Sequence, residues 1–230
     1  MKYPDDCIQS LIGADGWWEK NDTHQVVRGT LISCFVPHPD RVPYTFEVMG
    51  RTEPTEHARA DVRVRPLHAD HVARKAELPV AAMPLHQGEV WAAYRAKVRP
   101  CLVLSSDAGA GLGAKQQAVG STMLVAPFYA LNAKATSGAS EFLERVRHCE
   151  YPGLMWDLLP TAAEQAILRL DLLQPMGCSP GVYTSSEYKL SPQALPIVDA
   201  FLDWHIRGQL PANHTLTLFR DLMRSEFGTE

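Results

Sequence analysis

The sequence predicts a mainly β protein with helices at its C-terminal end. Short runs of β-branched and aromatic residues recur along most of the chain, and clusters of Pro, Gly and Asp separate them. Apolar residues recur convincingly at the three- or four-residue spacing of an α-helix only after residue 190. With 230 residues, 46% of them hydrophobic and 21% charged, the chain is long enough to bury a core without disulfides or metals.

The first 80 residues are predicted to form a β-rich extension. A short helix is expected over residues 5–11, and strands are expected over 26–36, 44–49 and 60–65, with proline-containing turns between them. Residues 68–77 have a helical composition that Pro79 ends, and a linker follows to residue 87. The sequence gives this extension no assigned role.

A second region, residues 86–210, is predicted to be the core domain. Strands are expected over 90–94, 101–105 and 123–126, and residues 142–150 and 166–173 are expected to complete the sheet. The connections 107–120 and 133–140 are rich in Gly, Ala and Ser, which is typical of flexible loops.

Two helices are predicted to end the chain. Ser191 suits an N-cap, Pro192 suits the first helical position and Gly208 suits the end of a helix that runs to about Ile206. A last helix, roughly 215–227, lies in the terminal segment 211–230 and is expected to present Leu218, Leu222 and Met223 on one face.

Composition points to a cytoplasmic protein that does not span a membrane. The five cysteines are scattered and form no Cys-x-x-Cys pair, so reduced thiols are expected. The N-terminus lacks the pattern of a signal peptide, and no apolar run has the length of a membrane span. The net charge of −4 argues against broad binding of nucleic acid, although a local basic patch can still bind it.

Two blocks of sequence carry a family resemblance. Gly88-Glu89-Val90-Trp91 is followed by Arg99-Pro100-Cys101-Leu102-Val103-Leu104-Ser105, in the order and separation of the first two strands of the MazF/PemK toxin endoribonucleases. A strand that ends at Pro127, the later Arg169-Leu170-Asp171 and the helix from Ser191 extend the similarity over about residues 86–207. In this alignment a short loop, 95–98, joins the first two strands, and Phe128 and Tyr129 follow the proline where many members have Thr.

The resemblance implies an SH3-like barrel, a homodimer and metal-independent cleavage of single-stranded RNA without a cofactor. It also implies an antitoxin protein as partner, within a toxin–antitoxin system. Cleavage of this kind is an attack of the 2′-hydroxyl on the adjacent phosphate, which needs a base, a proton source and fixed positive charge.

Three residues are the catalytic candidates. Asp171 is predicted to be the base, Arg169 is predicted to supply charge on the same strand face, and Arg99 is the second phosphate contact. The predicted substrate-binding residues are the basic and aromatic ones near these positions, namely Arg95, Lys97, Tyr94 and Phe128.

Alternative interpretations stay open at this point. Arg169 and Asp171 also fit an ordinary surface ion pair, Arg99 fits a loop charge before a proline, and the aromatic residues fit a core. His68-Ala69-Asp70-His71 fits an exposed helix start better than a metal site, because no third ligand is evident. The rival function is a non-catalytic barrel module that binds a protein or nucleic-acid partner.

Overall fold

The structure is a computed structural model that divides the chain into two units. It describes residues 2–12, 16–23, 25–39, 41–53, 55–56, 58–70, 85–86, 88–106, 122–131, 136–162, 164–179 and 181–227. Met1–Phe35 and Val98–Glu230 form one unit, here called the sheet unit. Val36–Lys97 form the other, here called the inserted unit because the chain leaves the sheet unit to make it and then returns.

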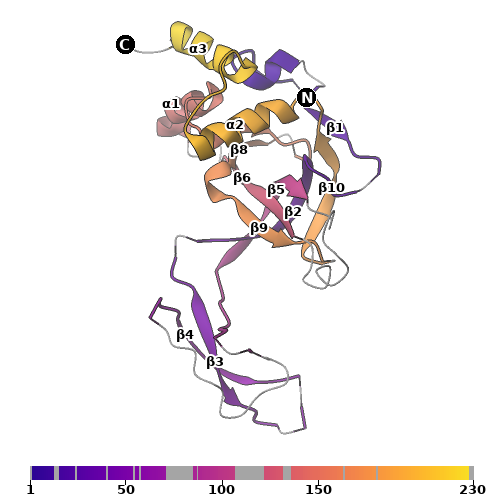
Figure 1. The fold of residues 1–230 in the computed structure, drawn as a ribbon, viewed down its shortest axis with the longest axis vertical. Helices are drawn as coiled ribbons and strands as arrows, with labels where there is room; N and C mark the ends of the chain where they lie inside the picture. The colour runs from indigo at the N-terminus through magenta and orange to yellow at the C-terminus, as the bar shows by residue number, and fades with distance from the viewer. Residues whose placement is uncertain are drawn as a thin grey trace. The chain divides into compact units, whose positions relative to one another are not determined.

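The sheet unit is built on a curled, eight-stranded half-barrel of antiparallel strand pairs (Figure 1). The strand order is β1-β10-β2-β5-β6-β8-β7, and β9 pairs with β6 off this path. The strands are β1 (Trp18–Lys20), β2 (Thr30–Pro37), β5 (Ala96–Ser106), β6 (Thr122–Ala130), β7 (Leu154–Leu158), β8 (Gln165–Arg169), β9 (Gln174–Gly177) and β10 (Tyr183–Leu190).

Strand β6 changes partner halfway along its length, and this explains the curl. Its first half, Thr122 to Val125, pairs with β9, whereas Phe128 to Ala130 pair with β8. The 3-10 turn η4 (Leu170–Leu172) carries the chain from β8 to β9 on the same edge. Two short strands on one edge and β5 on the other bend the sheet around a common centre.

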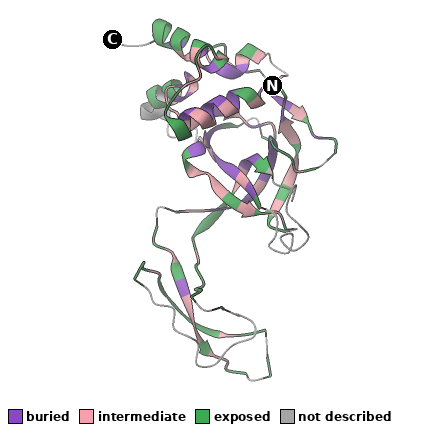
Figure 2. Cartoon of the chain, in the orientation of Figure 1, coloured by how far each residue is buried: buried purple, intermediate pink, exposed green. Residues whose placement is uncertain are grey.

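Besides η4, the described residues form three α-helices and one further 3-10 helix: η1 (Ile8–Ile12), α1 (Thr136–Arg147), α2 (Leu195–Arg207) and α3 (Thr215–Phe227). Helix α2 lies across one end of the curled sheet, and most of the buried residues lie on this helix and the strands (Figure 2). Phe201 of α2 is fully buried in the same core as Leu102, Phe128 and Leu168 of the sheet. The left-handed backbone of Gly208 ends α2, as its sequence predicts.

The first 35 residues are part of the sheet rather than part of a separate extension. Strand β1 pairs with β10, and β2 lies between β10 and β5. The buried thiols of Cys34 on β2 and Cys101 on β5 lie 3.4 Å apart, sulfur to sulfur. The structure therefore joins residues 1–35 to 98–230, where the sequence had grouped residues 1–80.

Gly88 to Tyr94 do not form the strand that precedes β5. Over this stretch the structure shows one isolated bridge, between Ala93 and Tyr44, and the neighbour of β5 is β2. Strand β2 is apolar and mostly buried, whereas Trp91 is 38% exposed, so burial favours β2 at this place. The segment 95–98 is thus no hairpin loop, and the whole inserted unit connects β2 to β5.

Two further expectations are wrong in detail. Residues 142–150 were expected in the sheet, but α1 extends to Arg147 and the following residues form a turn. Helix α3 has the predicted bounds but buries Leu216, Phe219 and Met223, while Leu218 and Leu222 are exposed. The strands predicted over 101–105 and 123–126 and most of the predicted helix α2 are confirmed.

The inserted unit contains a two-stranded antiparallel ribbon, β3 (Tyr44–Gly50) and β4 (Asp61–Pro66), as the sequence predicts. Phe46 faces Val64 and Val48 faces Val62, so apolar side chains share one side of the ribbon. The predicted helix 68–77 lies largely outside the described residues.

No helix among the described residues has the length and apolar character needed to cross a membrane.

A buried carboxyl ties the N-terminal segment to β7. Asp157 is fully buried and accepts hydrogen bonds from the Tyr3 hydroxyl and the Trp17 indole N–H, each at 2.9 Å. The Leu158 amide donates a third hydrogen bond at 2.7 Å. Burial nevertheless dominates and raises the pKa of Asp157 to about 7.

This pKa makes stability depend on pH. A carboxyl whose pKa is raised on folding contributes stability that is complete below its unfolded pKa and is lost as pH rises through about 7. We expect the unfolding free energy of the wild type, relative to Asp157→Asn, to fall by on the order of 3 kcal/mol between pH 4 and pH 8. Urea unfolding across this range measures the difference, and a difference that stays constant with pH would contradict the assignment.

Candidate functional site

Two arginines converge on the ring of one tyrosine in the sheet unit. The guanidinium carbon of Arg99 lies 3.6 Å from the centre of the Tyr129 ring, and that of Arg169 lies 5.4 Å from it. The three residues come from β5, β6 and β8, which are neighbours in the sheet. Strand pairing alone therefore brings together two positive charges that are 70 positions apart in the chain.

Strand register explains this meeting in detail. Cys101 of β5 is paired with Pro127 of β6. Arg99 lies two residues before Cys101 and Tyr129 lies two residues after Pro127, which is the same direction in space because the two strands are antiparallel. On the other edge Tyr129 is paired with Ile167 of β8, and Arg169 lies two residues beyond it. Residues two apart on a strand share a face, so all three side chains reach the same side of the sheet.

Asp171 and Arg169 form a bidentate ion pair. The Arg169 Nε and one terminal nitrogen donate to the two Asp171 oxygens at 2.7 and 2.6 Å. Arg169 ends β8 and Asp171 lies in the 3-10 turn η4, so the pair spans the end of a strand rather than one strand face. The hydrogen bonds from Arg169 lower the pKa of Asp171, which leaves an ionised carboxylate of reduced basicity.

His205 of α2 approaches the same carboxylate across Gly153. A Cβ atom at Gly153 would lie 3.2 Å from the His205 Nδ1 and 3.3 Å from the Asp171 Cβ, so both side chains pack against this glycine. The Gly153 carbonyl also accepts a hydrogen bond from the Leu170 amide at 2.8 Å, which holds the segment before β7 beside η4. The imidazole is half-buried, and its two ring nitrogens can accept or donate a proton in a hydrogen bond.

Arg99 keeps most of its hydrogen-bonding capacity unused. Its Nε is buried and has no hydrogen-bond partner, and no carboxylate pairs with it among the described residues. An arginine stacked on an aromatic face can still present its N–H edge to an anion. Arg99 is therefore the group in this cluster that is best prepared to bind a phosphate.

The other predicted site residues lie elsewhere. Tyr94, Arg95 and Lys97 belong to the inserted unit, and Tyr94 is 49% exposed. Phe128 is 1% exposed and packs against Trp18, with ring centres 6.4 Å apart, so no face of its ring is free for a base. The structure brings together Arg99, Arg169 and Asp171, whereas Phe128 is buried in the core.

Sequence reasoning missed Tyr129 and His205. The pair Phe128-Tyr129 offered a signal, because neighbours on a strand point to opposite faces and the residue with a hydroxyl is the better candidate for the outer face. His205 lies four residues after Phe201, at helical spacing, so the pattern directs it toward the core, and a histidine at a core-facing position is itself a signal. Only the packing of α2 against Gly153 shows its neighbour.

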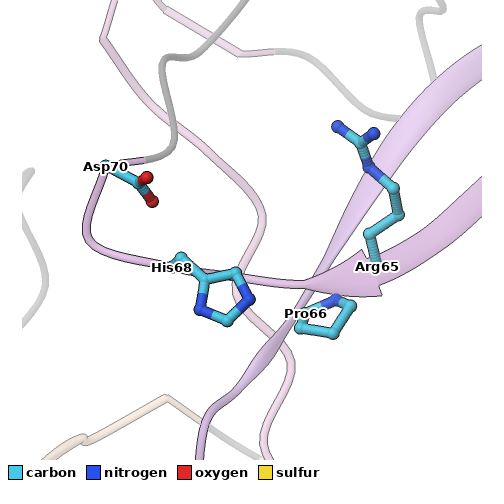
Figure 3. Close-up of a pocket in the computed structure, with 4 residues that line it drawn as sticks. All are labelled: Arg65, Pro66, His68 and Asp70. Atoms are coloured by element: carbon cyan, nitrogen blue, oxygen red, sulfur yellow. The ribbon is translucent and has the colours of Figure 1, made fainter.

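A hollow lies in the inserted unit, after β4. Arg65, Pro66, His68 and Asp70 line it, and Figure 3 shows Arg65 directed away from the loop that carries His68 and Asp70. Arg65 is already paired with Glu47. Among the residues that the structure describes, no three His, Cys, Asp or Glu side chains gather as metal ligands.

The cluster of Arg99, Tyr129, Arg169, Asp171 and His205, here called the arginine cluster, offers positive charge, a phenol and an imidazole within one region. These are the groups that recognise a phosphodiester and move protons at its oxygens. Comparisons of the chain with models of known protein families, with curated proteins and with solved structures find no match.

Proposed function

We propose that the protein is a metal-independent endoribonuclease that cleaves single-stranded RNA, acting as a toxin of the MazF/PemK type with an SH3-like barrel. One observation carries the proposal: Arg99 and Arg169 converge on Tyr129 next to Asp171 and His205. The resemblance of Arg99-Pro100 and of Arg169-Leu170-Asp171 to that family supports it, because these same arginines meet in the fold. An antitoxin partner, a homodimer and a cytoplasmic location follow from the resemblance.

The reaction divides among the residues of the arginine cluster. The 2′-oxygen attacks phosphorus, the bond from phosphorus to the 5′-oxygen breaks, and a 2′,3′-cyclic phosphate forms. Arg99 and Arg169 stabilise the added negative charge on the phosphoryl oxygens. His205 takes the proton of the 2′-hydroxyl, and the Tyr129 hydroxyl gives a proton to the departing 5′-oxygen.

Asp171 is better suited to position Arg169 than to act as the base. Both of its oxygens are occupied by Arg169, and its lowered pKa makes it a weak proton acceptor at neutral pH. This assignment replaces the sequence-based prediction that Asp171 is the base.

The rival function, a non-catalytic binding module, has one observation in its favour. The Asp171 carboxylate neutralises Arg169, and in the described part of the chain Arg99 is the cluster arginine that has no carboxylate partner. A binding site needs only that single charge, whereas catalysis needs Arg169 to contact the phosphate as well. Activity measurements separate the two.

The first test is cleavage of a single-stranded RNA in the presence of a metal chelator. We expect cyclic phosphate ends and a loss of about 10²–10³-fold in kcat/KM for Arg99→Gln, because one preorganised charge at the phosphate is removed. Arg28→Gln is the matched control, since Arg28 is an exposed arginine of the same unit that pairs with Asp199. Intact RNA at high protein concentration, with RNA binding retained, would favour the binding module.

The second test separates the roles of His205 and Asp171 through the pH dependence of kcat/KM. His205→Asn should remove the acidic limb of the profile, because the group that must lose a proton is gone. Asp171→Asn should lower the rate about tenfold or more while the acidic limb stays, because Arg169 loses its anchor but the base remains. An acidic limb that persists in His205→Asn and disappears in Asp171→Asn would return the role of base to Asp171.

A further inference from the structure

The inserted unit contains a small basic and aromatic pocket that is separate from the arginine cluster. His38, Arg41, Tyr44, Tyr94 and Arg95 line it together with two apolar residues, around a volume of about 130 Å³. All of these residues fall within Val36–Lys97. We call this the tyrosine pocket.

Backbone hydrogen bonds hold the walls of the tyrosine pocket in place. Tyr44 and Ala93 exchange two N–H to carbonyl hydrogen bonds, at 2.8 and 2.7 Å, and the His38 amide donates to the Arg95 carbonyl at 2.8 Å. The Leu67 amide donates to the Pro43 carbonyl at 2.8 Å and anchors the turn before β3. The pocket thus joins two segments that are 50 residues apart, and it exists before any ligand binds.

The two arginines of the pocket form no ion pair. Neither Arg41 nor Arg95 has an ion-pair partner among the described residues, which is also true of Arg63, whereas Arg59 is paired with Glu56 and Arg65 with Glu47. Of the described residues that line the pocket, none is Asp or Glu. Two guanidinium groups and an imidazole therefore line this hollow, and the described part of its lining contains no carboxylate, which favours an anion.

The rings of the pocket indicate what accompanies the anion. Tyr44 is 46% exposed and Tyr94 is 49% exposed, although an aromatic side chain normally buries more of its surface. Half-exposed phenol rings beside arginines are the elements that stack unpaired bases and hold their phosphates. A peptide partner would instead use a groove several residues long or the outer edge of the β3–β4 ribbon, whereas this hollow is a single compact cavity.

We propose that the tyrosine pocket binds one nucleotide of a single-stranded RNA, with its base against Tyr44 and Tyr94 and its phosphate between Arg41 and Arg95. This inference rests on the proposed function only in the choice of RNA as substrate. The pocket then gives the protein a second contact with the RNA strand, outside the cluster where the phosphodiester is cleaved.

The test measures binding, so that it does not depend on cleavage. A fluorescently labelled RNA with 2′-O-methyl groups cannot be cleaved through its 2′-oxygens, and its anisotropy reports affinity for the full-length protein at several salt concentrations. Arg41→Gln combined with Arg95→Gln should weaken binding about 10–100-fold and reduce the slope of log K against log salt by about one, because phosphate contacts are lost. Tyr94→Leu should weaken binding about tenfold and leave the slope unchanged, because stacking carries no charge.

Two controls make the result specific to the pocket. Arg59→Gln removes one charge from the same unit outside the pocket and should change the affinity less than twofold, since Arg59 is exposed and paired with Glu56. An acidic peptide of equal charge tests the other class of ligand and should compete poorly. RNA affinity equal to wild type in all pocket variants would overturn the proposal, and so would a peptide that competes as well as RNA and loses affinity in the same variants.

Failure here is distinguishable from failure of the nuclease proposal. Cleavage of a dinucleotide by the wild type tests the nuclease proposal alone, because this substrate is too short to need a second contact. If the wild type does not cleave it while the pocket variants still lose RNA affinity, the pocket stands and the nuclease proposal falls.

Discussion

The pairing of β6 with three other strands is the constraint on which the rest of the sheet unit depends. Strand β5 occupies one edge of β6, and β8 and β9 share the other edge. This division bends the sheet around its core, and it also places Tyr129 between the strands that carry Arg99 and Arg169. The register of β6 therefore determines both the curl of the sheet and the composition of the site. A one-residue slip of β6 would turn Tyr129 inward and bring Phe128 to the arginines.

The two arginines of the arginine cluster differ in their contacts with neighbouring side chains. Arg169 is satisfied by the two oxygens of Asp171, whereas Arg99 stacks on Tyr129 and its buried Nε has no hydrogen-bond partner. One arginine is therefore held in place by a carboxylate, and the other has no such partner among the described residues. Both lie against the same tyrosine ring.

The sequence predicted a mainly β protein with two C-terminal helices, the ribbon β3–β4, and much of β5 and β6, because these have strong local patterns. It misplaced the partner of β5, since Val90 and Trp91 look like strand residues and only burial shows that β2 takes that position. It grouped Arg169 with Asp171 from their spacing. The sequence did not identify His205 as a site residue. The approach of His205 to Asp171 depends on how α2 packs against Gly153, and no local sequence pattern indicates this contact.

The inserted unit interrupts the sheet unit between β2 and β5. Residues 36–97, which the sequence pattern divides among an extension, a linker and the first core strand, form a unit of their own. This unit holds five of the nine histidines of the chain, and nine Lys and Arg against eight Asp and Glu. The chain as a whole has a net charge of −4, whereas this unit has one more basic than acidic residue.

The central claim is that Arg99 and Arg169 act together on one phosphate, and a double-mutant cycle tests it most directly. The kcat/KM for single-stranded RNA is compared among the wild type, Arg99→Gln, Arg169→Gln and the double variant. The account predicts strong non-additivity, with the double variant losing little more than the worse single variant, because either loss dismantles the shared site. Losses that multiply independently, or single variants as active as the wild type, would contradict it.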